Sequence, residues 1–264
     1  MIHHMTHRTL ICVLLLSTAT AHAAPTRVVH VVVALCDNAN QGIVPVPAAL
    51  GNGQDPANNL YWGALYGVRS WFDKASEWKR VKHGGAAGHP ILERVVWRHA
   101  TADVLLVADA YDGAHIGAAT EDLLHYAAGG RAGRLPVEGD TVAIGGGADL
   151  IAYVGHNGLM DFATPKVNSR GSGRPVIVLA CASRNYFAAP FQAFGAKALL
   201  WTTGLMAPEA YTLRDALAGW VLREDGPAIA ERAAQAYHAF QKCGIAAARR
   251  LLVTGEPPTR PAAR

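Results

Sequence analysis

The chain has 264 residues, of which 51% are hydrophobic and 17% are charged. This composition is typical of a globular protein and excludes a largely disordered one. The formal net charge is +4 at pH 7, and Lys and Arg are scattered without a block of like charge, so no nucleic-acid-binding surface is indicated.

The first two dozen residues have the layout of a secretory signal peptide. A weakly basic start precedes a short apolar run at residues 10–16, and Ala21-His22-Ala23 is a small-x-small cleavage motif. The apolar run is too short to span a bilayer as a helix, although an uncleaved anchor is the alternative. We therefore expect residues 1–23 to be removed and the protein to be exported, either periplasmic or secreted, with no membrane span.

Three cysteines remain after the expected cleavage: Cys36, Cys181 and Cys243. Because the number is odd, at least one thiol is free or pairs with another chain in an oxidising compartment. A Cys36–Cys243 bridge would leave Cys181 free, but the sequence does not establish this pairing. No CxxC pair or close Cys/His cluster predicts a structural zinc site.

Short β-branched or aliphatic runs predict strands. These runs cover residues 28–35, 95–99, 104–108, 149–154, 175–179 and 198–201. Their nearly continuous apolar character indicates burial on both faces of a sheet.

Apolar residues at helical spacing predict helices between these strands. The helices cover residues 59–72, 119–128, 185–194, 208–222 and 228–252, with Gly244 as a candidate break. Strands alternating with helices predict one α/β domain over residues 24–253, a three-layer sandwich with a mostly parallel, doubly wound sheet. A Pro-rich tail, residues 254–264, follows it.

A long segment, residues 41–59, leaves the carboxyl end of the first predicted strand. It is rich in Pro, Gly and Asn, which favour turns over regular elements. A long ordered loop at this position more often serves a site than a simple connection.

Reactive and polar residues follow the predicted strands, at the edge of a parallel sheet where ligands bind. They include His156 and Cys181, which come directly after two hydrophobic runs. Adjacent strands lie ~4.8 Å apart, so the two side chains can approach each other if their strands are neighbours. A thiol needs such a neighbouring base to be deprotonated. We predict a cysteine–histidine pair.

The arrangement of these residues resembles the caspase–legumain–gingipain clan of cysteine peptidases. The resemblance is carried by DLIAYVGHNG (149–158) and PVIVLAC (175–181). It implies a caspase-like sheet, Cys181 as the nucleophile, His156 as the proton donor to the leaving amine, and backbone amides near Gly158 and at Cys181 around the oxyanion. The sequence departs from the family pattern at Asn157, which separates the histidine from the glycine, and in its short spacer.

A second resemblance is to a group of uncharacterised exported bacterial proteins. It is carried by residues 36–63, 155–162 and 201–213. This similarity implies no particular reaction.

Several further residues are site candidates, each with an ordinary structural alternative. Asp161 either orients the imidazole or is a solvated carboxylate or helix cap. The other pocket candidates, whose alternatives are helix capping or interaction with a helix dipole, are Asp37, Asn38, Asp109, Thr203 and Glu209.

Two remaining groups are weaker candidates. Cys36 also ends a strand and is a rival nucleophile, with core burial or a disulfide as the alternative. His83 and His89 are close in sequence, but without a carboxylate or Cys beside them we predict no metal site and no cofactor.

Together these patterns predict an exported cysteine hydrolase, a peptidase that acts on a peptide or protein substrate. Two alternatives remain open. One is a catalytically silent caspase-like module that binds a partner at the same cleft, and the other is an amidase acting on cell-wall peptides.

Overall fold

The computed structural model describes residues 1, 25–85, 87–167 and 172–255. The expected signal peptide and most of the expected tail therefore lie outside the described residues. None of the helices in the described part of the chain combines the length and hydrophobicity that crossing a bilayer requires. Within this part, eight strands form one mixed sheet of order β10-β9-β8-β7-β1-β4-β3-β2.

The centre of the sheet consists of parallel strands. These are β9 (Lys197–Thr202), β8 (Pro175–Leu179), β7 (Leu150–Val154), β1 (Arg27–Ala34) and β4 (Val104–Tyr111). They are dominated by Val, Ile, Leu and Ala and are largely buried, as expected for strands covered on both faces. The prediction of an α/β fold with a mostly parallel sheet is confirmed.

Antiparallel strands extend the sheet at both edges. β3 (Ile91–His99) pairs with β4, and β2 (Trp78–Val81) pairs with β3. At the other edge, β10 (Leu252–Val253) pairs with β9. The runs at residues 95–99 and 104–108 are thus parts of one hairpin, whereas β2 and β10 were not predicted.

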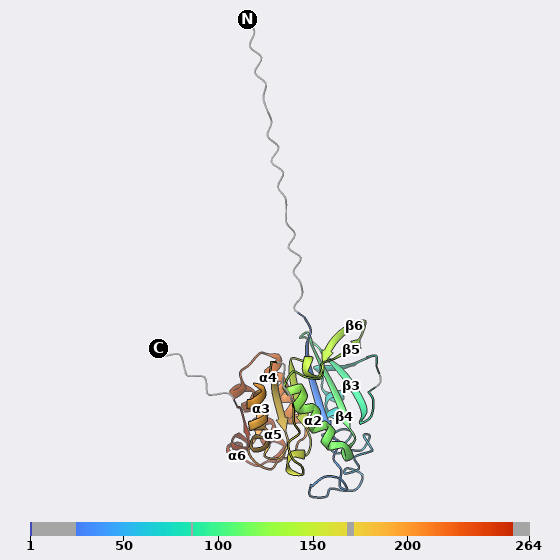
Figure 1. Cartoon of the computed structure of the whole chain (residues 1–264). Coiled ribbons are helices and arrows are strands. Elements are labelled where there is room, and N and C mark those ends of the chain that lie inside the picture. The colour runs from blue at the N-terminus through green and yellow to red at the C-terminus, as the bar shows by residue number, and fades with distance from the viewer. Residues whose placement is uncertain (2–24, 86, 168–171, 256–264) are drawn as a thin grey trace, which may run out of the picture.

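Helices cover both faces of the sheet, as Figure 1 shows. Val29 and Val31 of β1 belong to the core on one face, and Val28 and Val32 belong to the core on the other. The first face is covered by α1 (Val68–Lys74), α4 (Ala210–Val221), α5 (Gly226–Gln241) and α6 (Ile245–Leu251). The second is covered by α2 (Ile116–Ala127), α3 (Ser183–Phe194) and the hairpin of β5 (Gly133–Val137) and β6 (Asp140–Ile144).

Of two predictions about the helices, one is confirmed and the other is partly wrong. The break at Gly244 is confirmed, because this residue has φ +86° and separates α5 from α6. The predicted helix over residues 59–72 is wrong in its first half, which consists of turns. The Asn59 side chain accepts a hydrogen bond from the Cys36 N–H and donates to the Cys36 carbonyl, so it joins this segment to the end of β1.

The chain order reverses at β1, which lies between β4 and β7. The segment after β1, here called the β1–α1 loop (residues 35–67), lies at the carboxyl end of the parallel strands, at the bottom of Figure 1. Such a reversal is where open α/β sheets form their ligand-binding crevices.

Candidate active site

A cavity of about 410 Å³ lies at the carboxyl ends of the parallel strands. Segments after four of these strands contribute to its wall. The lining residues are Gly42, Ile43, Val44, Tyr61, Gly155, His156, Met160, Cys181, Leu205, Met206 and Pro208. We call this the Cys181 cavity. His156 and Cys181 share it because β7 and β8 are adjacent and parallel.

The turn that carries Cys181 is held by buried hydroxyl groups. The Ser183 hydroxyl donates to the Val178 carbonyl (3.0 Å) and accepts from the Thr202 N–H (2.9 Å), while the Thr202 hydroxyl donates to the Ala180 carbonyl. Ala182 sits in the left-handed region at φ 48°, which costs a residue with a Cβ about 1–2 kcal/mol. Neighbouring hydrogen bonds therefore hold the cysteine on a sharp strand-to-helix turn.

The Cys181 thiol contacts the segment after β9. The Met206 N–H donates to Sγ at 3.4 Å, and the thiol donates to the Met206 carbonyl at 3.6 Å. The Cys181 carbonyl accepts from Asn157 Nδ2 at 2.8 Å, whereas its N–H has no acceptor among the described residues. Two backbone N–H groups therefore lie near the sulfur. One is that of Met206, which donates to Sγ, and the other is that of Cys181 itself.

His156 is buried and is held by a carboxylate. Its Nε2 lies 2.9 Å from Asp161 Oδ2, which also accepts from the Gly42 N–H at 3.0 Å. A carboxylate only accepts hydrogen bonds, so Nε2 carries the proton and Nδ1 keeps a basic lone pair. Within the described chain no hydrogen bond joins His156 directly to the thiol; such bonds are often long before substrate binds.

Two glycines permit this packing. Gly155 precedes the histidine at φ +151°, and a Cβ there would lie 2.8 Å from the Ala34 carbonyl oxygen. A Cβ on Gly42 would lie 2.4 Å from Asp161 Oδ1. Both positions require glycine because backbone or carboxylate atoms occupy the space that a side chain needs.

The rival nucleophile, Cys36, is fully buried beneath Tyr61. Burial raises the pKa of its thiol to about 11, although a hydrogen bond with Tyr61 opposes part of this increase. Burial also raises the pKa of Tyr61 well above its ordinary value, with further contributions from Cys36 and Cys181. Cys36 therefore lies in the core behind the cavity wall. It is not in a disulfide, and neither is Cys181 or Cys243.

The residues next to His156 have structural contacts. Asn157 is buried, and its side chain accepts from the Leu159 N–H while donating to the Cys181 carbonyl, so it joins the ends of β7 and β8. Gly158 does not line the cavity; a Cβ there would lie 2.6 Å from both Phe162 and Thr120.

Asp37 and Asn38 organise the β1–α1 loop. Asp37 accepts from the backbone of Ala39 and from the Asn40 side chain. Burial alone raises the pKa of Asp37, but hydrogen bonds, the largest from Gln54, outweigh this effect and lower it. Asn38 both donates to and accepts from the Val46 backbone. Neither side chain lines the cavity, although the loop they build supplies part of its wall.

Asp109 lies within β4, before its end at Tyr111, and is placed away from the cavity. It is fully buried and accepts two hydrogen bonds from the Arg94 guanidinium, at 2.5 and 2.6 Å. His30 Nε2 lies 3.0 Å from the same carboxylate, and His30 Nδ1 accepts from the Gly145 N–H. This is a buried ionic network inside the fold.

Thr203 and Glu209 also lie outside the cavity lining. The Thr203 hydroxyl donates to the Arg250 carbonyl, and Glu209 accepts from the Tyr211 hydroxyl and from Gln241. The segment between them supplies the wall through Leu205 and Met206, whereas Glu209 was the candidate selected from it. The available signal was this apolar pair immediately after the polar end of β9.

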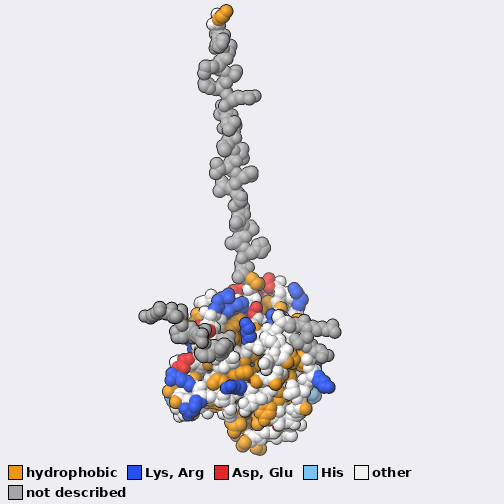
Figure 2. Space-filling view, turned by 60° about the vertical axis from the view of Figure 1, so that its left-hand side comes forward, with side chains coloured by type: hydrophobic (Ala, Val, Ile, Leu, Met, Phe, Trp, Pro, Cys, Tyr) orange, Lys and Arg blue, Asp and Glu red, His pale blue; other side chains and the backbone are white. Residues whose placement is uncertain are grey.

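The rim of the cavity is apolar. Val44 and Leu205 line it with exposed fractions of 87% and 77%, and none of the lining residues is Asp, Glu, Lys or Arg. Figure 2 shows hydrophobic side chains gathered over the centre and lower part of one face, toward the end at which the β1–α1 loop lies in Figure 1. Solvated apolar side chains around a concave site favour an apolar ligand group.

Comparisons with family models, with curated proteins and with solved structures gave no match.

Proposed function

We propose that the protein is a cysteine hydrolase that cleaves a peptide bond next to an apolar side chain. The observation that carries this proposal is the shared cavity, in which a cysteine on a sharp turn and an Asp161-held histidine lie among apolar residues. The caspase-like architecture implied by the His156 and Cys181 motifs is part of the same proposal.

The proposed reaction has two stages. His156 Nδ1 accepts the thiol proton as Sγ attacks the carbonyl carbon, and the Cys181 N–H donates to the developing oxyanion. The imidazolium then protonates the leaving amine as the carbon–nitrogen bond breaks, leaving a thioester. Water hydrolyses the thioester to a carboxylic acid and restores the thiol.

The charge of the lining supports the choice of substrate. A pocket without Asp, Glu, Lys or Arg cannot pair a charged substrate side chain, whereas Ile43, Val44, Leu205 and Met206 bury an apolar one. Peptide chloromethyl ketones ending in Leu or Phe should therefore inactivate the protein faster than those ending in Asp or Lys.

Thiol reactivity provides the direct test. A Cys243→Ser parent removes the exposed competing thiol, so iodoacetamide labelling at neutral pH reports on Cys181. We expect His156→Ala to slow the labelling about tenfold or more, in line with the usual contribution of a positioned base, and the remote His125→Ala to leave the rate unchanged.

Two outcomes would redirect the assignment. Slow labelling that is insensitive to His156→Ala would indicate a silent binding module. Rapid labelling with cleavage of cell-wall peptide fragments, but not of proteins, would indicate an amidase using the same pair.

A further inference from the structure

A second group of side chains at the same edge of the sheet involves residues from two segments of the chain. The β3–β4 ladder aligns Ile91 with Tyr111, and beyond it the Asp112 N–H donates to the Pro90 carbonyl at 2.8 Å. His89 is thereby brought to the end of β4. A short 3₁₀ turn, Gly113–His115, then returns His115 toward His89.

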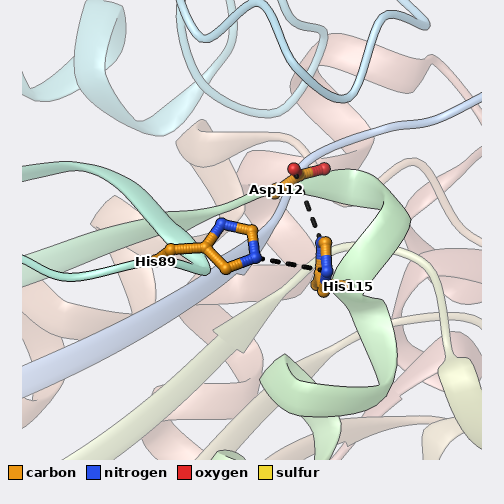
Figure 3. A group of neighbouring side chains, drawn as sticks. All are labelled: His89, Asp112 and His115. Atoms are coloured by element: carbon orange, nitrogen blue, oxygen red, sulfur yellow. Dashed lines mark hydrogen bonds and ion pairs between the residues drawn. The ribbon is translucent and has the colours of Figure 1, made fainter.

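In Figure 3, dashed lines join His115 both to His89 and to Asp112. His89 Nε2 lies 3.3 Å from His115 Nε2, with ring centroids 4.4 Å apart and ring planes at 86°. His115 Nδ1 lies 3.5 Å from Asp112 Oδ2. One ligand atom from each of the three residues lies within 4.8 Å of the others.

The separation between the two histidine Nε2 atoms suits a metal ion. A tetrahedral Zn²⁺ ion with Zn–N bonds of about 2.0–2.1 Å places neighbouring ligand nitrogens about 3.3–3.4 Å apart. The observed separation between the His89 and His115 Nε2 atoms is 3.3 Å.

The two oxygens of the Asp112 carboxylate have different partners. Asp112 Oδ1 accepts from Gln54 Nε2 at 2.6 Å and from the Ala114 N–H at 2.9 Å, which fixes the group. Oδ2 faces only His115 among the described residues. Asp112 is 8% exposed, whereas both histidines are exposed, so the carboxylate is held in place while the imidazoles remain open to solvent.

We propose that His89, Asp112 and His115 form a binding site for a divalent transition-metal ion, with Zn²⁺ the best match. Two imidazoles and one carboxylate are the ligand types that Zn²⁺ uses, whereas Ca²⁺ and Mg²⁺ prefer oxygen ligands. The open side leaves a coordination position for water.

One hydrogen-bonded path connects the site to the loop that supplies part of the Cys181 cavity wall. Gln54 Nε2 donates both to Asp112 Oδ1 and to Asp37 Oδ2, the carboxylate that organises the β1–α1 loop. None of the three metal-site residues lines the cavity. A bound ion thus stabilises the loop that forms the cavity wall and takes no part in the thiol chemistry.

The experiment uses the chelator-treated mature protein and titrates it with ZnCl₂ by calorimetry. We expect one ion per chain, a Tm that rises with ZnCl₂, and visible absorption bands of a four-coordinate ion when Co²⁺ replaces Zn²⁺. His89→Ala, His115→Ala and Asp112→Asn should each weaken Zn²⁺ affinity about tenfold or more.

His83→Ala is the matched control, because this histidine precedes the same strand but lies outside the group. It should leave Zn²⁺ affinity unchanged. Absence of saturable binding, or an equal loss in His83→Ala and His89→Ala, would overturn the proposal. A circular dichroism spectrum of each variant separates loss of ligand from loss of fold, and His89→Gln provides a milder variant if His89→Ala is unfolded.

Discussion

The contact between Asp161 and His156 allows the proposed base to be tested by two substitutions. Asp161→Asn can keep an oxygen where Oδ2 now accepts from His156 Nε2 and the Gly42 N–H, so the ring orientation and tautomer are retained. What it removes is the negative charge that stabilises an imidazolium. Asp161→Ala removes both the charge and the acceptor.

The magnitude follows from the 2.9 Å separation between Nε2 and Oδ2. Coulomb's law gives about 6 kcal/mol at an effective dielectric constant of 20 and about 1.4 kcal/mol at 80. The Asp161 side chain is 27% exposed, which favours the screened end of this range. A loss of about 1.5–3 kcal/mol corresponds to a rate about 10- to 160-fold lower in Asp161→Asn.

The assay is the rate constant for iodoacetamide alkylation of Cys181 between pH 6 and 9, measured in the Cys243→Ser parent. Asp161→Ala should be roughly tenfold slower than Asp161→Asn, because a hydrogen bond to a charged group contributes about 1.5–3 kcal/mol. Rates within twofold of the parent for both variants would refute the reasoning. Asp161 would then be only a loop carboxylate bound to Gly42.

Three predictions concern the buried groups. Arg94→Met leaves the Asp109 carboxylate buried without its main partner and should lower the free energy of unfolding by about 3–5 kcal/mol in urea titrations; a change below about 1 kcal/mol would show that the carboxylate is paired otherwise. Burial alone raises the pKa of Asp109, but its bonds to Arg94 and His30 lower it below the ordinary value. Because the folded-state pKa is the lower one, this stability is present at neutral pH and is lost as the pH falls below about 4, so the Tm of the wild type should drop more steeply there than that of Asp109→Asn. With a thiol pKa of about 11, Cys36 is ionised in only about one molecule per thousand at pH 8. Mass spectrometry should find it unmodified by iodoacetamide in the native protein and modified in urea, and native labelling would contradict its burial.

The central strands were predictable because burial on both faces leaves a continuous apolar run that needs no knowledge of its neighbours. β8 has the predicted bounds, residues 175–179, and β7 differs by one residue. The edge strands were harder to predict from the sequence. β2 and the β5–β6 hairpin carry polar residues on exposed positions, so their pairing depends on partners elsewhere in the chain.

The residues of the candidate site also differ in whether the sequence could predict them. His156 and Cys181 could be selected because parallel neighbouring strands end at one edge, a consequence of topology alone. Asp109 was misplaced because a strand end cannot be located from an acidic residue. Only the tertiary structure supplies the partly buried Arg94 and the buried His30 that stabilise it. The contact of Met206 with the thiol was not predicted because it is made through backbone atoms, whose positions no residue type specifies.

The amino-acid sequence by itself determined the α/β class, the buried strands and the two residues of the proposed dyad, since these follow from local hydrophobicity and from strand direction. The tertiary structure decided which loops close the cavity, which carboxylate holds His156, and that His89 lies against His115. Those features depend on contacts between residues distant in sequence, and such contacts exist only after the sheet has set the register of its strands.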